Sequence, residues 1–186
     1  MKKIIVFSLF IGALVLSSCD PASKYATEIS KIDSCLTILD SLQSDYDGIE
    51  FDSLQGMVDH VLRNEDTIKK YYHPDTLSME IGTRMNDCKG IRKTLKGVGT
   101  KKENFAAEIS DLKVQFESLK TDISEGVLSE EQINEYLARE LFDLNILHVT
   151  FDDFNAMQKI QKKYYYASVP YIDRLIVELK SAPQED

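Results

Sequence analysis

Apolar residues recur at steps of three and four along most of this chain, which is the spacing of one face of an α-helix. A first run extends from about Ser23 to Asp47, where an Asp-Gly pair interrupts it. A second opens at Asp52 and closes at His73, because the residue before a proline is pushed out of the helical conformation. A third begins near Asp75 or Thr76 and stops at the glycines 97 and 99. The first half of the chain is therefore predicted to form three helices.

Two further helices are predicted from capping boxes, in which a hydroxyl and a Glu or Gln side chain satisfy reciprocal backbone amides. Thr100 to Glu103 precedes a heptad stripe, and Ser129 to Gln132 follows the stop at Gly126. The stripe comprises Phe105, Ile109, Leu112, Phe116, Leu119 and Ile123. No breaker follows Ser129 before Tyr166, which allows a helix of about 57 Å. We expect Ser168 and Pro170 to kink or restart that helix.

No alternating strand segment, hairpin dipeptide or Gly-rich loop interrupts these helices. The sequence predicts an all-α fold, an elongated antiparallel bundle of about five helices with no sheet, over residues 25–180. Short connections should make successive helices neighbours. Residues 181–186 are expected to form a disordered tail.

The chain opens with the three parts of a signal peptide. Lys2 and Lys3 precede an apolar run over residues 4–16, and small residues follow it. The run is shorter than the roughly 20 residues that span a bilayer. The segment Leu16-Ser17-Ser18-Cys19 resembles the lipobox of bacterial lipoproteins. The resemblance implies cleavage after residue 18, acylation of Cys19 and a lipidated tether over 19–24, on the inner or outer membrane and facing the periplasm or the cell surface.

Charge narrows the range of partners. Without residues 1–18 the chain has 20 basic and 31 acidic side chains, a net charge of 20 − 31 = −11. Such a chain repels phosphate backbones, so nucleic-acid binding is not expected. An electrostatic hold on anionic lipid is equally disfavoured, which leaves the N-terminal lipid as the membrane contact. About 168 mature residues suit one domain or two small bundles.

Two cysteines remain once Cys19 carries lipid, namely Cys35 and Cys88. Both lie in or beside an apolar stripe, so we expect both to face inward. A pair of cysteines in an oxidising compartment forms a disulfide or stays as two thiols, and both outcomes are open. Their spacing fits no zinc motif.

Signals for catalysis are weak. His148 and Asp152 lie one helical turn apart beside Asp153, but one such pair does not make a metal site, and an interfacial histidine is the simpler interpretation. His60 and His73 are interpreted as structural or surface residues. No nucleophile elbow, zinc-protease motif, phosphate loop or dinucleotide fingerprint occurs. We therefore predict a protein that is not an enzyme, with no catalytic residues, cofactor or metal.

Tyrosines provide the best candidate binding site. They are predicted at the ends of two helices, flanked by lysines at 69, 70, 162 and 163, and tyrosine faces stack on sugars and peptide side chains. The six are Tyr71, Tyr72, Tyr164, Tyr165, Tyr166 and Tyr171. The alternative is that they only close the bundle end. The predicted function is a non-catalytic binding or scaffolding module with a protein partner in the envelope, and the second hypothesis is a lipoprotein that binds a glycan or small ligand through this patch.

Two pairs of segments also resemble each other. Residues 25–30 match 105–110, and residues 51–57 match 151–157. A Lys-Lys-Tyr-Tyr run follows at 69–72 in the first copy and at 162–165 in the second. One hypothesis is a duplicated helical hairpin. The other is chance similarity between amphipathic helices.

Overall fold

The computed structural model describes residues 21–73 and 78–181. Within these residues the chain forms five long helices, one helix of four residues and no strand, which confirms the predicted all-α bundle. The helices are α1 (Pro21–Lys24), α2 (Ala26–Asp47), α3 (Phe51–Tyr71), α4 (Met79–Thr94), α5 (Val98–Glu125) and α6 (Glu130–Ser181). No described helix has the length and apolar character needed to cross a membrane.

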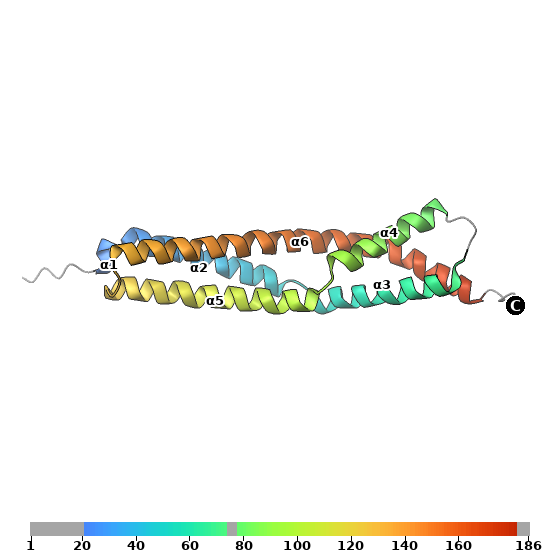
Figure 1. Cartoon of the computed structure of the whole chain (residues 1–186), viewed down its shortest axis with the longest axis horizontal. Coiled ribbons are helices and arrows are strands. Elements are labelled where there is room, and N and C mark those ends of the chain that lie inside the picture. The colour runs from blue at the N-terminus through green and yellow to red at the C-terminus, as the bar shows by residue number, and fades with distance from the viewer. Residues whose placement is uncertain (1–20, 74–77, 182–186) are drawn as a thin grey trace, which may run out of the picture.

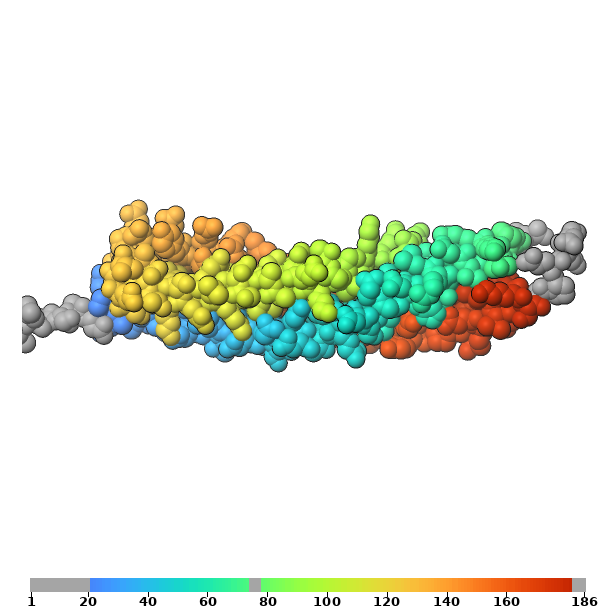
Figure 2. All heavy atoms as spheres, turned by 90° about the horizontal axis from the view of Figure 1, so that it is seen from below, coloured from blue at the N-terminus to red at the C-terminus, as the bar shows by residue number. Residues whose placement is uncertain are grey.

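The helices form a rod of three antiparallel passes (Figure 1). α2 and α3 make the first pass, α4 and α5 return as the second, and the 52 residues of α6 make the third alone. At 1.5 Å per residue α6 is about 78 Å long. We call α1, α2, α5 and residues 130–153 of α6 the first half of the rod, and α3, α4 and residues 154–181 the second half. Figure 2 shows α5 beside α2 in the first half and α3 beside α6 in the second.

Neighbouring helices in the sequence are not always neighbours in the rod. α2 does not pack on α3, and α4 does not pack on α5, so the prediction that successive helices are neighbours is wrong at these two connections. Gly48 keeps a near-helical conformation (φ −76°, ψ −8°), and the amide of Phe51 bonds to the carbonyl of Ile49. The chain is displaced sideways there without reversing, and Ile49 and Phe51 are both buried.

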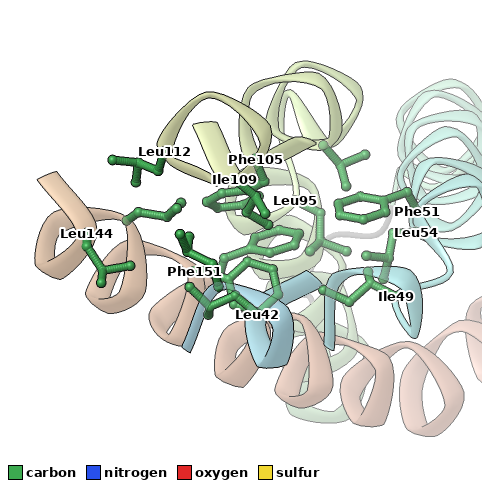
Figure 3. Close-up of a cluster of buried hydrophobic side chains, with 14 of the residues drawn as sticks. Leu42, Ile49, Phe51, Leu54, Leu95, Phe105, Ile109, Leu112, Leu144 and Phe151 are labelled. Carbon is green, nitrogen blue, oxygen red and sulfur yellow. The ribbon is translucent and has the colours of Figure 1, made fainter. Parts of the chain in front are cut away.

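Aromatic rings from all three passes meet at the level of these breaks (Figure 3). Phe51 stacks on Phe154 with ring centroids 5.8 Å apart. Phe105 packs edge-on against Phe151 at 5.2 Å and also contacts Phe154 at 5.5 Å. Such pairs each contribute about 0.5–1.5 kcal/mol beyond the burial of their area. The aromatic cluster thus joins the two halves of the rod.

The same cluster contradicts the duplication hypothesis. Phe105 and Phe151 are in contact, whereas the matching residues Tyr25 and Phe51 lie beyond opposite ends of α2. The 22 residues of α2 separate them by about 33 Å. In the second proposed copy, 105–110 and 151–157 lie side by side in a hairpin. In the first, 25–30 and 51–57 follow one another along a straight pass, so the similarity does not reflect a repeated structure.

One predicted capping box is present and the other is not. Ser129 Oγ accepts from the amide of Gln132 at 3.3 Å, and Gln132 Oε1 accepts from the amide of Ser129 at 2.9 Å, as predicted. α5, however, begins at Val98 behind Gly97, whose φ of +72° is left-handed. Thr100 therefore lies inside α5 and does not cap it.

The N-terminal end of the described chain is packed on the bundle. α1 contacts α5, and Pro21 lies so close to Gly126 that a Cβ there would be 2.8 Å from Pro21 Cγ. Gly126 also has a φ of +70°, which favours glycine. The predicted tether over 19–24 is wrong in this respect, because residues 21–24 belong to the bundle. The signal peptide 1–18, Cys19 and most of the predicted tail lie outside the described residues, and α6 extends to Ser181.

Candidate functional site

The two halves of the rod have different cores. Around α2 and α5 the buried side chains are apolar, as in Ile32, Leu39 and Phe116. In the described structure the buried polar residues all lie on the α3 and α6 segments of the second half. They are Asn64, Glu65, Gln158, Gln161 and Ser168. Polar groups that could form a site are therefore concentrated in the second half.

His60 is the centre of a hydrogen-bonded group between α3 and α6. Its Nδ1 lies 2.7 Å from the hydroxyl of Tyr165, and its Nε2 lies 3.0 Å from Oδ1 of Asp173. Asn64 Nδ2 donates to the same Asp173 oxygen at 2.7 Å. Because a carboxylate only accepts, Nε2 carries a proton and donates to Asp173, and Nδ1 is the ring nitrogen that meets the Tyr165 hydroxyl. Burial, followed by the charge of Asp173, raises the pKa of Tyr165 and keeps the phenol protonated.

This group ties α3 and α6 together. The sequence interpretation of His60 as a structural residue agrees with its hydrogen bonds. Its partners Tyr165 and Asp173 were not foreseen, because they are 105 and 113 residues away. No pattern within α3 identifies which turn of α6 lies opposite.

A second polar group joins α4 to α6 near Pro170. Ser168 Oγ donates to Asp87 Oδ2, and Arg84 Nη1 donates to the carbonyl of Ala167 at 3.3 Å. α6 continues through Pro170, so the helix does not restart there. A proline inside a helix opens the hydrogen bonds of the preceding turn. The carbonyl that Pro170 leaves without an amide partner is that of Tyr166, and Arg84 donates to the next carbonyl, that of Ala167, in the same turn.

Cys35 and Cys88 are buried and free, which confirms the predicted inward orientation and contradicts the disulfide. No Cα atom of α2 lies within 8 Å of one in α4, and both helices are fully described. A disulfide requires less than about 7 Å. The break at Gly48 places the two helices in opposite halves of the rod. Burial, then the charges of Glu65 and Asp87, raises the pKa of Cys88 to about 11, and burial also raises that of Cys35.

The six tyrosines do not form one patch. Tyr164, Tyr165 and Tyr166 lie within α6, level with His60, and Tyr71 lies eleven residues further along α3, or about 16 Å. Tyr165 faces His60, while Tyr171 lies 5.9 Å below the guanidinium of Arg84. Tyr164 and Tyr166 are exposed, and Tyr71 and Tyr72 are half-buried at the end of α3. The premise that two helix ends meet is wrong, because α6 extends ten residues beyond Tyr171.

The flanking lysines are dispersed as well. Lys162 reaches Glu50 at 3.1 Å, at the level of the breaks, and Lys69 pairs with Asp66 at 3.6 Å on α3. His148 and Asp152 form a surface pair, 3.4 Å apart and about half exposed. Among the described residues no three His, Cys, Asp or Glu side chains are grouped so as to hold a metal ion.

A row of exposed apolar side chains follows the outer face of α6. We call Phe142, Ile146, Val149, Met157, Ile160 and Tyr164, together with Asp153 at its centre, the α6 stripe. The six apolar members are between 42% and 63% exposed. They recur at steps of three and four, but on a different face from the buried Leu144, Leu147 and Phe151. Isolated exposed apolar residues are ordinary, whereas a continuous patch marks an interaction site.

Two clefts between α5 and α6 border the α6 stripe. The larger, of about 420 Å³, is lined by Phe105, Phe154 and Met157 with Asp153 and Lys101 at its rim. The smaller, of about 300 Å³, includes Leu112 and Ile146 beside acidic side chains. Neither contains a tyrosine. Together the stripe and clefts form an apolar surface with polar edges, which is the form of a protein-binding surface.

No protein-family model, no curated protein and no solved structure matches this chain.

Proposed function

We propose that this is a lipid-anchored protein of the bacterial cell envelope whose rod carries a non-catalytic surface for binding another protein. The observation that carries the proposal is the α6 stripe. Six large apolar side chains are about half exposed along one helix face. Covering them with a partner is favourable by roughly 25 cal/mol for each Å² of apolar surface that is buried.

The lipid part of the proposal is supported by the lipobox resemblance at Cys19 and by the position of α1. Only Asp20 lies between Cys19 and Pro21 in the sequence, and α1, which begins at Pro21, is packed against α5. An acyl anchor at Cys19 is therefore attached close to one end of the rod. The second half lies at the other end, up to about 78 Å away along α6.

Anchoring is tested by Cys19→Ser in the full-length precursor. Two or three acyl chains hold a protein on a bilayer for long periods, so the variant should leave the membrane fraction or accumulate as an unprocessed precursor. Retention of the fully processed variant on membranes washed with high salt would contradict the anchor.

Binding is tested by placing a photo-crosslinking amino acid at Phe142 or at Ile160 in the expressed lipoprotein. The matched control is Val177, which lies on the same helix, is 65% exposed and is outside the stripe. Protein adducts at both stripe positions and not at Val177 are expected. Equal labelling at all three positions, or none at the stripe, would contradict the proposal.

A further inference from the structure

The α6 stripe has the same spacing when it is read in either direction. Its positions are 142, 146, 149, 153, 157, 160 and 164, with successive steps of 4, 3, 4, 4, 3 and 4. The average step of about 3.67 is close to 3.6, so the row stays on one face of a straight helix. A two-fold axis beside Asp153 would pair Phe142 with Tyr164, Ile146 with Ile160 and Val149 with Met157. Such self-complementarity is what a two-fold interface requires.

The rod is also strongly polarised in charge. The first half has 7 basic and 18 acidic side chains, a net charge of 7 − 18 = −11. The second half has 12 basic and 8 acidic side chains, a net charge of 12 − 8 = +4. Two copies packed in parallel place −11 beside −11. Two antiparallel copies place each acidic half beside a basic one, which favours that orientation.

Charges beside the stripe follow the same division. In the first half the flank is formed by α5, and Glu108, Asp111 and Asp143 line the cleft next to Ile146. Beyond Asp153 the same flank is formed by α4, because Thr94 and Met157 share the larger cleft. α4 has four basic residues and two acidic ones, although Arg92 is paired with Glu65 of α3 and Arg84 binds the carbonyl of Ala167. A two-fold axis across the rod brings the acidic flank of one copy against the half of the other copy that carries the net positive charge.

The area available is sufficient for a dimer of moderate affinity. Between Phe142 and Tyr164 the stripe is about 33 Å long. With α6 and one flanking helix, each about 10 Å wide, the face covers roughly 660 Å² a copy. Stable interfaces bury about 800 Å² a partner, so association in the micromolar range is expected.

We propose that the partner of the α6 stripe is a second copy of this chain, bound antiparallel about an axis beside Asp153. This inference rests on the proposed function of the stripe as a protein-binding surface and names its partner. It also assigns a role to Asp153. The two Asp153 carboxylates face each other at the axis, and their repulsion limits the affinity. Asp153→Asn should tighten the dimer about tenfold.

Orientation is tested by cysteine cross-linking in a chain that begins at Asp20 and so lacks Cys19. This chain retains every residue of the hydrophobic core in the part of the protein that the structure describes, from Ile32 to Ile176. The native thiols of Cys35 and Cys88 are buried and do not compete. Under mild oxidation Asp153→Cys should form a covalent dimer.

Phe142→Cys alone is the matched control, because the antiparallel register places its two copies about 33 Å apart along the rod. It should not form a disulfide with itself, but should form one when mixed with Tyr164→Cys. Self-linking of Phe142→Cys, or no linking of Asp153→Cys, would overturn the antiparallel arrangement.

Association is measured by sedimentation equilibrium between about 2 and 200 μM. The wild-type chain should show a monomer–dimer equilibrium, Ile146→Glu should weaken it at least thirtyfold, and Val177→Glu should leave it unchanged. A wild-type chain that is monomeric throughout would overturn the inference. If the photo-crosslinks at Phe142 then contain only a different protein, the proposed function stands and the self-association fails. If there are no crosslinks at all, both fail.

Discussion

The hydroxyl of Ser168 on α6 donates a hydrogen bond to the carboxylate of Asp87 on α4, two residues before Pro170 in the same helix. Ser168 is completely buried, so this hydroxyl has no access to water. Arg84 also approaches the Ser168 hydroxyl, at 3.4 Å. The three residues form a polar joint that holds α4 against a helix with an interrupted hydrogen-bond ladder.

Ser168→Ala should therefore destabilise the protein. The substitution leaves the Asp87 carboxylate without its buried donor, which costs about 1–3 kcal/mol of unfolding free energy. Urea denaturation followed by circular dichroism measures the change. Ser110→Ala is the control, because Ser110 is exposed on α5. Equal effects of the two substitutions would show that the hydrogen bond to Asp87 does not contribute.

Phe116→Ala should destabilise by about 3–5 kcal/mol, because Phe116 is fully buried and its removal leaves a cavity. Val114→Ala on the same helix is the control. Val114 is 59% exposed, so its truncation should change the unfolding free energy by less than about 0.5 kcal/mol. A small effect at Phe116 would mean that the stripe of α5 is a surface and not a core.

Cys88 should be unreactive while the protein is folded. With a pKa of about 11, only about one thiol in a thousand is ionised at pH 8, and burial blocks access to it. Alkylation followed by intact mass analysis should label no cysteine of the native chain from Asp20 onward and two after unfolding in urea. A disulfide-linked dimer or an intramolecular disulfide under non-reducing conditions would contradict the free thiols.

Raised pKa values also predict a loss of stability in alkali. The folded pKa of Cys88 is about 11 and its ordinary value is 9.0, so the unfolded chain loses this proton first. The stabilisation from this group is complete below pH 9 and is lost as the pH rises through 11, by up to about 3 kcal/mol at about 1.4 kcal/mol per pKa unit. Tyr165, whose pKa is also raised, acts in the same direction. Urea midpoints at pH 8 to 11 measure the decline, and it should be shallower in Cys88→Ala. An equal slope in that variant would assign the decline to other groups.

Gly126→Ala should destabilise the end of the rod where α1 packs. A left-handed conformation costs a residue with a Cβ about 1–2 kcal/mol, and the new methyl would also displace Pro21. Gly56→Ala within α3 is the matched control. It has no atom within 4 Å of the added Cβ, so it should stabilise by about 0.5–1 kcal/mol. Thermal unfolding of the two variants should shift in opposite directions.

The helices were predictable from the sequence because their apolar spacing and stops are local signals. The stripe of α5 from Phe105 to Ile123 and the capping box at Ser129 both occur as expected. The course of the chain at Gly48 was not predictable, because a displaced and a reversed connection leave the same periodicity on either side. The tyrosine patch depended on that course and was wrong for this reason, and the same course decides that Cys35 and Cys88 stay free, an outcome that the sequence left open.

The candidate site was missed for a related reason. The exposed stripe of α6 overlaps in sequence with a buried one, so the helix reads as apolar on two faces. Only the positions of α2, α4 and α5 show which face is covered. His60, Tyr165 and Asp173 are likewise ordinary residues singly, and their hydrogen bonds exist only because α3 runs alongside the second half of α6.

α6 passes without interruption through the level at which both other passes are broken. Two breaks at one level would form a hinge if the third pass were broken there too. The continuous α6 stiffens the rod at that level, because bending the rod would require distorting the backbone hydrogen bonds of a helix. The first half, with its apolar core, and the second half, whose core also includes buried polar side chains, should consequently unfold in one cooperative transition. A pull applied between the two ends of the rod would be carried along a single helix.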